Sequence, residues 1–166
     1  MSRSARRVNL AAGYLLHHQP YRETSRILEV FTHEHGRLTL FARGVRGPKA
    51  KLAAVLQPFQ RLLLSWSGRG EAAQLTGAEL AGPAVPLPSA ALMPAFYLNE
   101  LLMKLTTRHD PIPALFDAYA DTVEGLRDGA AVEPALRVFE KRLLEALGYG
   151  LDLAVEAQGG RGVEPD

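Results

Sequence analysis

The chain has 166 residues, of which 47% are hydrophobic and 22% are charged. This balance is typical of globular proteins, so it favours one domain or two small ones and excludes wholesale disorder. The absence of cysteine excludes disulfides, thiolate metal sites and cysteine nucleophiles, and it fits a reducing compartment. No apolar run approaches the roughly 18–20 residues that a membrane span needs. We therefore expect a cytoplasmic protein.

The net charge of +1 conceals two halves of opposite sign. Residues 1–80 contain 12 Lys and Arg against 5 Asp and Glu, whereas residues 81–166 contain 7 against 13. The halves therefore carry +7 and −6. Such segregation is typical of a nucleic-acid-binding part joined to a part with another role, and the alternative is a solvated basic surface without a partner.

Five segments of the first 80 residues have the composition and spacing of β-strands with turns between them. The predicted strands are residues 8–17, 26–32, 37–43, 60–66 and about 72–79. Gly13 lies inside the first strand, where a glycine favours the bulge or bend that closes a small barrel. One helical turn is expected before Pro58. This order of elements is typical of the OB-fold, a five-stranded barrel.

The proline-rich stretch GPAVPLP separates this part from one with helical periodicity, because prolines end both strands and helices. Helices are predicted at residues 89–107, 113–127 and 133–147. In the first helix Leu92, Phe96, Asn99 and Met103 lie near one line, flanked by Leu98, Leu101, Leu102 and Leu105. The predicted stripe of the second helix is Leu115, Phe116, Tyr119 and Val123, and the predicted inward-facing residues of the third are Leu136, Phe139, Leu143, Leu144 and Leu147. The predicted division is an OB-fold domain at 1–81, a linker at 82–88 and a small all-α domain at 89–166 with a loose tail from about 157.

The predicted strand at 37–43 has one apolar face and one face that combines cations with an aromatic ring. Side chains alternate along a strand, so Arg37, Thr39, Phe41 and Arg43 share the second face. Such a face suits single-stranded nucleic acid, with phosphates on the cations and bases stacked on the ring. The alternative is that Phe41 packs beneath the helical part. The residues expected to bind DNA are Arg22, Arg37, Phe41, Arg43, Arg46, Lys49, Lys51, Arg61 and Arg69.

A second basic patch lies on the third predicted helix, in an otherwise acidic half. It consists of Arg137, Lys141 and Arg142. Cations beside apolar residues can receive an acidic, hydrophobic peptide tail. Glutamates lie three or four positions from these cations, so ordinary ion pairing along the helix is the alternative.

No motif points to catalysis. His33 and His35 lack an evident third ligand for a metal site, so we interpret both as solvated turn residues. GVRG at 44–47 has the spacing of the KH-domain GxxG loop, but it follows a strand instead of joining two helices. No phosphate-binding glycine fingerprint has the required spacing. We expect no catalytic activity, no cofactor and no bound metal.

Several motifs of the chain occur together, in the same order, in one protein family. They are RETS, LEVFT and HGRLTLFARG within 21–44, QPF at 57–59, GRGE at 68–71, YLNELL at 97–102 and EPALRVFEKRLLEALGYG at 133–150. In these motifs, and over residues 8–153, the chain resembles RecO, a family of bacterial DNA repair and recombination mediators.

The resemblance implies an OB-fold followed by a helical domain, without enzymatic activity. The family binds single- and double-stranded DNA, anneals complementary strands, and works with RecR to load RecA onto strands coated by single-strand-binding protein (SSB). It also binds the acidic C-terminal tail of SSB through the helical domain, where Arg137 matches a family position. Some members bind zinc through four cysteines, which this chain lacks. The family extends further than this chain, so the resemblance implies either a truncated product or a missing remainder, and loss of that part would impair annealing and SSB binding.

We therefore predict a non-catalytic, nucleoid-associated recombination mediator that binds single- and double-stranded DNA, the SSB tail and RecR, and acts indirectly on RecA. The alternative is a protein-interaction adaptor whose basic barrel contacts an acidic protein partner.

Overall fold

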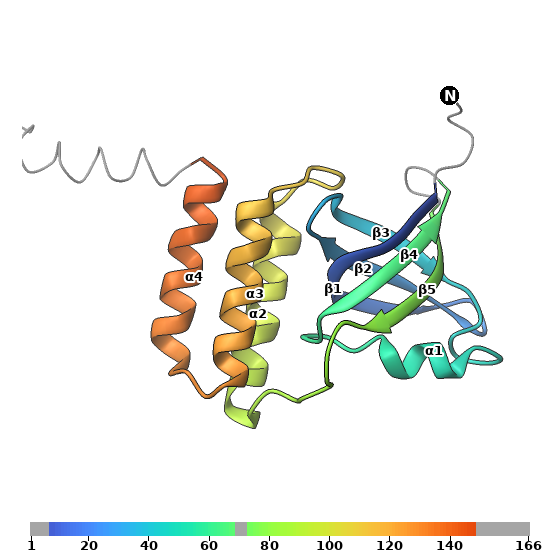
Figure 1. Ribbon diagram of the computed structural model, residues 1–166, viewed down its shortest axis with the longest axis horizontal. Helices are drawn as coiled ribbons and strands as arrows, with labels where there is room; N and C mark the ends of the chain where they lie inside the picture. The colour runs from blue at the N-terminus through green and yellow to red at the C-terminus, as the bar shows by residue number, and fades with distance from the viewer. Residues whose placement is uncertain (1–6, 69–72, 149–166) are drawn as a thin grey trace, which may run out of the picture.

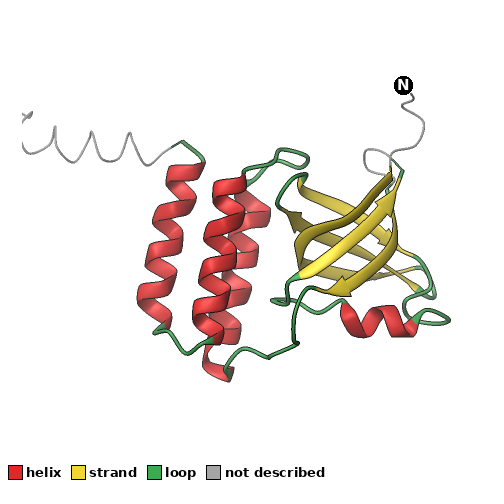
Figure 2. Cartoon of the chain, viewed as in Figure 1, coloured by secondary structure: helices red, strands yellow, loops and turns green. Residues whose placement is uncertain are grey.

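The computed structural model describes residues 7–68 and 73–148, which form a β-barrel followed by three helices (Figure 1). The elements are β1 Arg7–Tyr21, β2 Ser25–Thr32, β3 Gly36–Ala42, α1 Ala50–Val55, β4 Leu62–Ser67, β5 Gln74–Leu80, α2 Ser89–Leu105, α3 Pro113–Arg127 and α4 Val132–Ala146. Strand and helix types agree with the prediction, and most boundaries differ by a few residues. Figure 2 shows the three long helices standing beside one another on one side of the barrel.

The barrel is closed, with the strand order β1-β2-β3-β5-β4 and β1 paired with both β2 and β4. Gly13 lies where β1 changes partner, since it is paired with Thr32 of β2 and with Leu62 of β4. A Cβ atom at this position would lie 3.0 Å from the carbonyl oxygen of Phe31, so the crossing favours glycine. The predicted five-stranded OB-fold barrel is confirmed, with α1 between β3 and β4.

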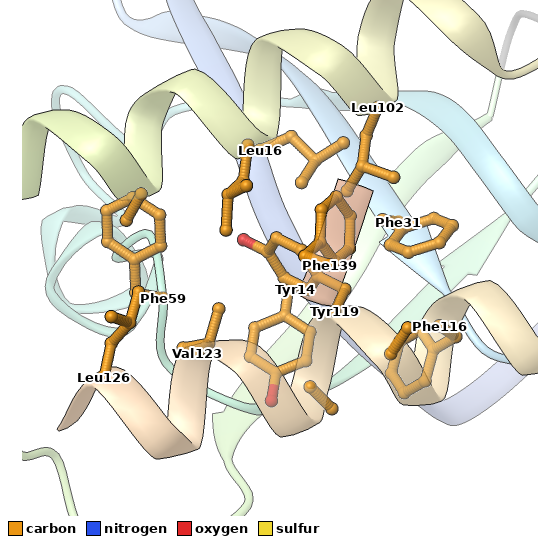
Figure 3. Close-up of a cluster of buried hydrophobic side chains, with 14 of the residues drawn as sticks. Tyr14, Leu16, Phe31, Phe59, Leu102, Phe116, Tyr119, Val123, Leu126 and Phe139 are labelled. Atoms are coloured by element: carbon orange, nitrogen blue, oxygen red, sulfur yellow. The ribbon is translucent and has the colours of Figure 1, made fainter. Parts of the chain in front are cut away.

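Two hydrophobic cores meet at β1, because its successive side chains point in opposite directions. Leu15 belongs to the core inside the barrel, whereas Tyr14 and Leu16 belong to the core shared with the helices. In that shared core the ring of Tyr14 lies 5.0 Å from the ring of Tyr119 and 5.7 Å from the ring of Phe116, measured between centroids (Figure 3). The helices therefore pack directly on the outer wall of the barrel. The division into an OB-fold domain at 1–81, a linker at 82–88 and a helical domain at 89–166 stays a prediction.

The buried residues agree with the predicted apolar stripe in α3 and agree only in part in α2 and α4. All four predicted core residues of α3 are buried. In α4 only Phe139 and Leu143 are buried. In α2 the prediction is wrong at Leu92 and Phe96, which are 40% and 46% exposed. The buried residues of α2 are Ala91, Ala95, Leu98, Asn99 and Leu102. The buried face is therefore rotated away from Leu92 and Phe96, toward Leu98 and Leu102, and it includes two alanines that allow close helix packing.

Asn99 is a buried polar residue that joins three elements. Its amide donates a hydrogen bond of 3.1 Å to the carbonyl oxygen of Leu16 in β1. Its side-chain oxygen accepts a hydrogen bond of 2.6 Å from the hydroxyl of Tyr119 in α3. Burial raises the pKa of Tyr119 well above its usual value, so the hydroxyl keeps the proton that it donates. The polar groups are satisfied inside the shared core, as burial requires.

The connection between barrel and helices is held by Arg127 at the end of α3. Its guanidinium donates hydrogen bonds to the carbonyl oxygens of Val85 and Phe59 and, over 3.1 Å, to the carboxylate of Glu124. The proline-rich stretch at 82–88 is therefore fixed against both parts of the molecule.

Candidate nucleic-acid interface

Two loops pack against each other at the end of the barrel that lies away from the helices (Figure 1). One joins β1 to β2 and the other joins β3 to α1. The backbone N–H of Arg46 donates a hydrogen bond of 2.7 Å to the carbonyl oxygen of Thr24, and its guanidinium donates one of 3.4 Å to the carbonyl oxygen of Arg22. Gly47 lies so close to Thr24 that an added Cβ atom would be 3.1 Å from its methyl group. The two loops thus present their side chains as one surface.

Five exposed cations lie on these loops and on the first turn of α1. They form what we call the basic loop cluster: Arg22, Arg43, Arg46, Lys49 and Lys51. Within residues 7–68 and 73–148, none of the five forms an ion pair with a carboxylate. Their charges are consequently available to a polyanion, and counterion release on binding phosphates would supply the affinity.

Two aromatic rings lie next to the basic loop cluster. The rings of Tyr21 and Phe41 are 5.5 Å apart between centroids and inclined by 55°. The guanidinium carbon of Arg22 lies 5.0 Å from the centroid of the Tyr21 ring. Phe41 is half-buried and lies outside the core shared with the helices. Tyr21 is not among the residues expected from the sequence to bind DNA, because nothing in the local pattern brings residue 21 next to residue 41.

Arg37 occupies the opposite end of the same strand, and it is only 7% exposed. Its guanidinium forms an ion pair with Glu29 and donates hydrogen bonds to the hydroxyl and the carbonyl oxygen of Thr106, at 2.8 and 2.6 Å. The carboxylate of Glu29 also accepts hydrogen bonds from Arg108, at 2.9 and 3.2 Å, and from Thr39, at 2.9 Å. Because its donors serve these partners, we leave Arg37 out of the proposed DNA surface.

The loop between α2 and α3 is what covers Arg37. The N–H of His109 donates a hydrogen bond of 2.8 Å to the carbonyl oxygen of Arg37, which extends the edge of β3 by one short bridge. Gly36 packs on the backbone of Asp110, where a Cβ atom would come within 2.7 Å. The outer face of β2 and β3 is therefore covered at the end of Phe31 and Arg37, whereas Ile27 and Phe41 at the other end are partly exposed.

The remaining residues expected to bind DNA lie elsewhere. Arg61 is exposed, but its guanidinium carbon is 5.7 Å from the centroid of the Phe116 ring, on the helix side of the barrel. It does not belong to the basic loop cluster. Arg69 lies outside the described residues, as does the tail from about 157.

The three cations of the basic patch on α4 differ in their exposure and contacts. Arg137 is exposed, and its ion pair of 3.8 Å with Glu133 joins two exposed side chains, so it contributes little. Lys141 is exposed, while Arg142 donates a hydrogen bond of 3.1 Å to Asp121 of α3. Phe139 is buried in the shared core, so it cannot form the apolar side of a surface groove.

An apolar hollow of about 300 Å³ lies beside Arg142, between α3 and α4. Val138, which is 56% exposed, and the small residues Gly125, Ala130 and Ala135 contribute to its lining. Sequence reasoning missed this hollow, since its two walls come from different helices.

The two histidines of the β2–β3 turn have separate contacts. His33 lies 3.8 Å from the carboxylate of Asp117, whereas the ring of His35 lies 5.3 Å from the ring of Trp66. Within the described part of the chain, no three His, Cys, Asp or Glu residues are grouped to hold a metal ion. Nor does any helix in that part have the length and apolar character to cross a membrane.

The closed barrel with an exposed basic end, followed by three helices, places this chain in the class of OB-fold proteins with a C-terminal helical part. The match to family models is more specific: residues 8–84 match the N-terminal part of recombination protein O, and residues 89–165 match its C-terminal part. The chain belongs to the RecO family, as the motifs predicted.

Three curated relatives, each named DNA repair protein RecO, illustrate the similarity. The protein of Methylococcus capsulatus is 54% identical over 160 residues, which are 96% of this chain and 66% of the relative. The protein of Nitrosococcus oceani is 50% identical over 158 residues, or 95% and 64%, and that of Azoarcus sp. is 48% identical over 160 residues, or 96% and 66%. The chain thus spans slightly less than two thirds of the length of these relatives.

Proposed function

We propose that this protein is a non-catalytic DNA-binding mediator of recombinational repair. The observation that carries the proposal is the basic loop cluster, five exposed cations on two docked loops beside a pair of aromatic rings. Membership of a family whose members are named DNA repair protein RecO supports the same role. The cations bind the phosphates of single- or double-stranded DNA, and these contacts fix the position of the strand without reading its sequence.

In the proposed mechanism the positive charge of the barrel promotes the annealing of complementary DNA strands. A surface that neutralises phosphates reduces the repulsion between two complementary strands and allows them to pair. Together with RecR, the protein helps to load RecA onto strands coated by SSB, and the patch on α4 holds the acidic tail of SSB. These activities place the protein in the cytoplasm, at the nucleoid. None of these steps requires a cofactor or a covalent intermediate.

The test is a titration of a fluorescent single-stranded oligonucleotide at several salt concentrations. If all five cations reach phosphates, the logarithm of the affinity falls against the logarithm of the salt concentration with a slope of about −3 to −4. The double variant Arg43→Ala with Lys49→Ala removes two contacts, so its slope is expected to be shallower by about 1 to 1.5. Affinity should fall for single strands and duplex alike.

The control is the double variant Arg137→Ala with Lys141→Ala, which removes the same charge from α4. It is expected to bind DNA as the parent does, because the attraction of distant surface charges is screened beyond about 10 Å at 0.1 M salt. Absence of DNA binding even at low salt would exclude the proposal and favour an adaptor that uses the barrel to contact an acidic protein.

A further inference from the structure

We propose that Tyr21 and Phe41 form a two-ring platform that stacks on unpaired bases and so gives the barrel a preference for single strands over duplex. This inference rests on the proposed DNA binding, and it assigns a separate task to the rings. The cations attract any polyanion, whereas an aromatic face distinguishes exposed bases from bases that are stacked inside a duplex.

The platform is built from two strands that are not paired with each other. Tyr21 ends β1 and Phe41 lies near the end of β3, with β2 between them. Tyr21 is paired with Ser25 of β2 and Phe41 with Ile27 of the same strand, so both rings project from the same outer face. The side chain of Ser25 is small, and the rings meet across it with centroids 5.5 Å apart.

The rings are held in place by the backbone around them. The N–H of Phe41 donates a hydrogen bond of 3.1 Å to the carbonyl oxygen of Ala73, which fixes the end of β3 against the last strand. Arg22 has a backbone φ of +56°, a left-handed conformation that turns the chain directly after Tyr21. The guanidinium of Arg22 lies over the Tyr21 ring, where its flat face offers a further surface for stacking.

The platform also lies where a bound DNA strand would approach the outer face of β2 and β3. The α2–α3 loop covers the face at Arg37, so a bound DNA strand would reach the face from the end of Tyr21 and Phe41. At that end the basic loop cluster lies beside the rings. Phosphates on the cations therefore place the adjoining bases at the rings.

The experiment compares two single strands of the same length and charge, about 16 nucleotides long, one an oligothymidylate and the other abasic throughout. Phe41→Leu keeps an apolar side chain but removes the aromatic face. It is expected to lower the affinity for oligothymidylate by about 5- to 100-fold and to leave the affinity for the abasic strand and for duplex unchanged. Tyr21→Leu should act in the same way, whereas Tyr21→Phe keeps the ring and should bind as the parent does.

The control is Phe96→Leu, which removes a partly exposed ring on α2 that packs against Phe59 and not against Tyr21 or Phe41. It should bind both strands as the parent does. The platform is excluded if Phe41→Leu and Tyr21→Leu bind oligothymidylate as tightly as the parent, or if they lose affinity for both strands equally. A parent that binds the two strands with equal affinity also excludes it, yet leaves the proposed DNA binding intact. A parent that binds neither strand at low salt excludes both.

Discussion

Arg37 and Glu29 face each other on the outer wall of the barrel, where α2 ends against β3. Arg37→Ala would leave the carboxylate of Glu29, which is 7% exposed, with fewer donors, and it would remove the donors from the end of α2. Breaking such a buried pair from one side costs about 3 kcal/mol of unfolding free energy. We expect that loss in urea unfolding, with no change in the DNA affinity of the folded protein.

Arg43→Ala is the matched comparison, since Arg43 directly follows the same strand but is exposed and forms no ion pair within residues 7–68 and 73–148. It should leave the unfolding free energy within about 0.5 kcal/mol of the parent and weaken DNA binding. If Arg37→Ala instead weakened DNA binding at unchanged stability, Arg37 would belong to the binding surface after all.

The contrast between Arg37 and Arg43 shows what the alternation of apolar and polar side chains along β3 can predict. It correctly places Arg37 and Phe41 on the side of the barrel opposite to Leu38 and Leu40, whereas Arg43 lies in the turn after the strand. The alternation does not predict which end of that side is covered, because the α2–α3 loop that covers Arg37 lies 69 residues or more further along the chain. The packing of the helices determines the partners of Arg37, and the sequence around residue 37 does not predict them.

At the scale of elements, the packing of α2 depends on a polar residue. The predicted stripe of α2 correctly included Asn99, but it also included Leu92 and Phe96, which lie outside. The buried face of α2 combines Leu98 and Leu102 with the small residues Ala91 and Ala95 and the amide of Asn99. A stripe that is centred on the largest apolar residues misses the two alanines. In α3, which is covered on several sides, periodicity and burial agree.

Asn99→Leu is predicted to destabilise the protein by about 2–4 kcal/mol. The change leaves the carbonyl oxygen of Leu16 and the hydroxyl of Tyr119 buried without their partner, and each unsatisfied group costs about 1–3 kcal/mol. Urea unfolding measures the loss. Tyr119→Phe is the milder control, expected to cost about 1 kcal/mol because Asn99 keeps its bond to Leu16.

The two changes should not be additive, since they remove the same hydrogen bond. An Asn99→Leu variant as stable as the parent would mean that the shared core does not depend on this link between β1, α2 and α3.

At the scale of the whole molecule, the two proposed binding surfaces lie at opposite ends. The basic loop cluster lies at the end of the barrel near α1, and the patch of Arg137 and Lys141 lies on α4, the helix furthest from the barrel (Figure 1). The charge of the sequence is divided in the same way, +7 in residues 1–80 and −6 in residues 81–166. The acidic half repels DNA, which should confine a bound DNA strand to the barrel and leave α4 accessible to the SSB tail.

This arrangement predicts that the molecule binds DNA and the SSB tail independently. Arg137→Ala with Lys141→Ala should weaken the binding of a fluorescent peptide with the acidic, hydrophobic sequence of that tail by about tenfold, as loss of charge-assisted contacts does. Fluorescence anisotropy measures the peptide affinity with and without saturating oligonucleotide, and the two values should agree. Arg43→Ala with Lys49→Ala is the charge-matched control and should bind the peptide normally. Unchanged peptide affinity in the α4 variant would exclude the patch, and competition by DNA would mean that the two ligands share one basic surface.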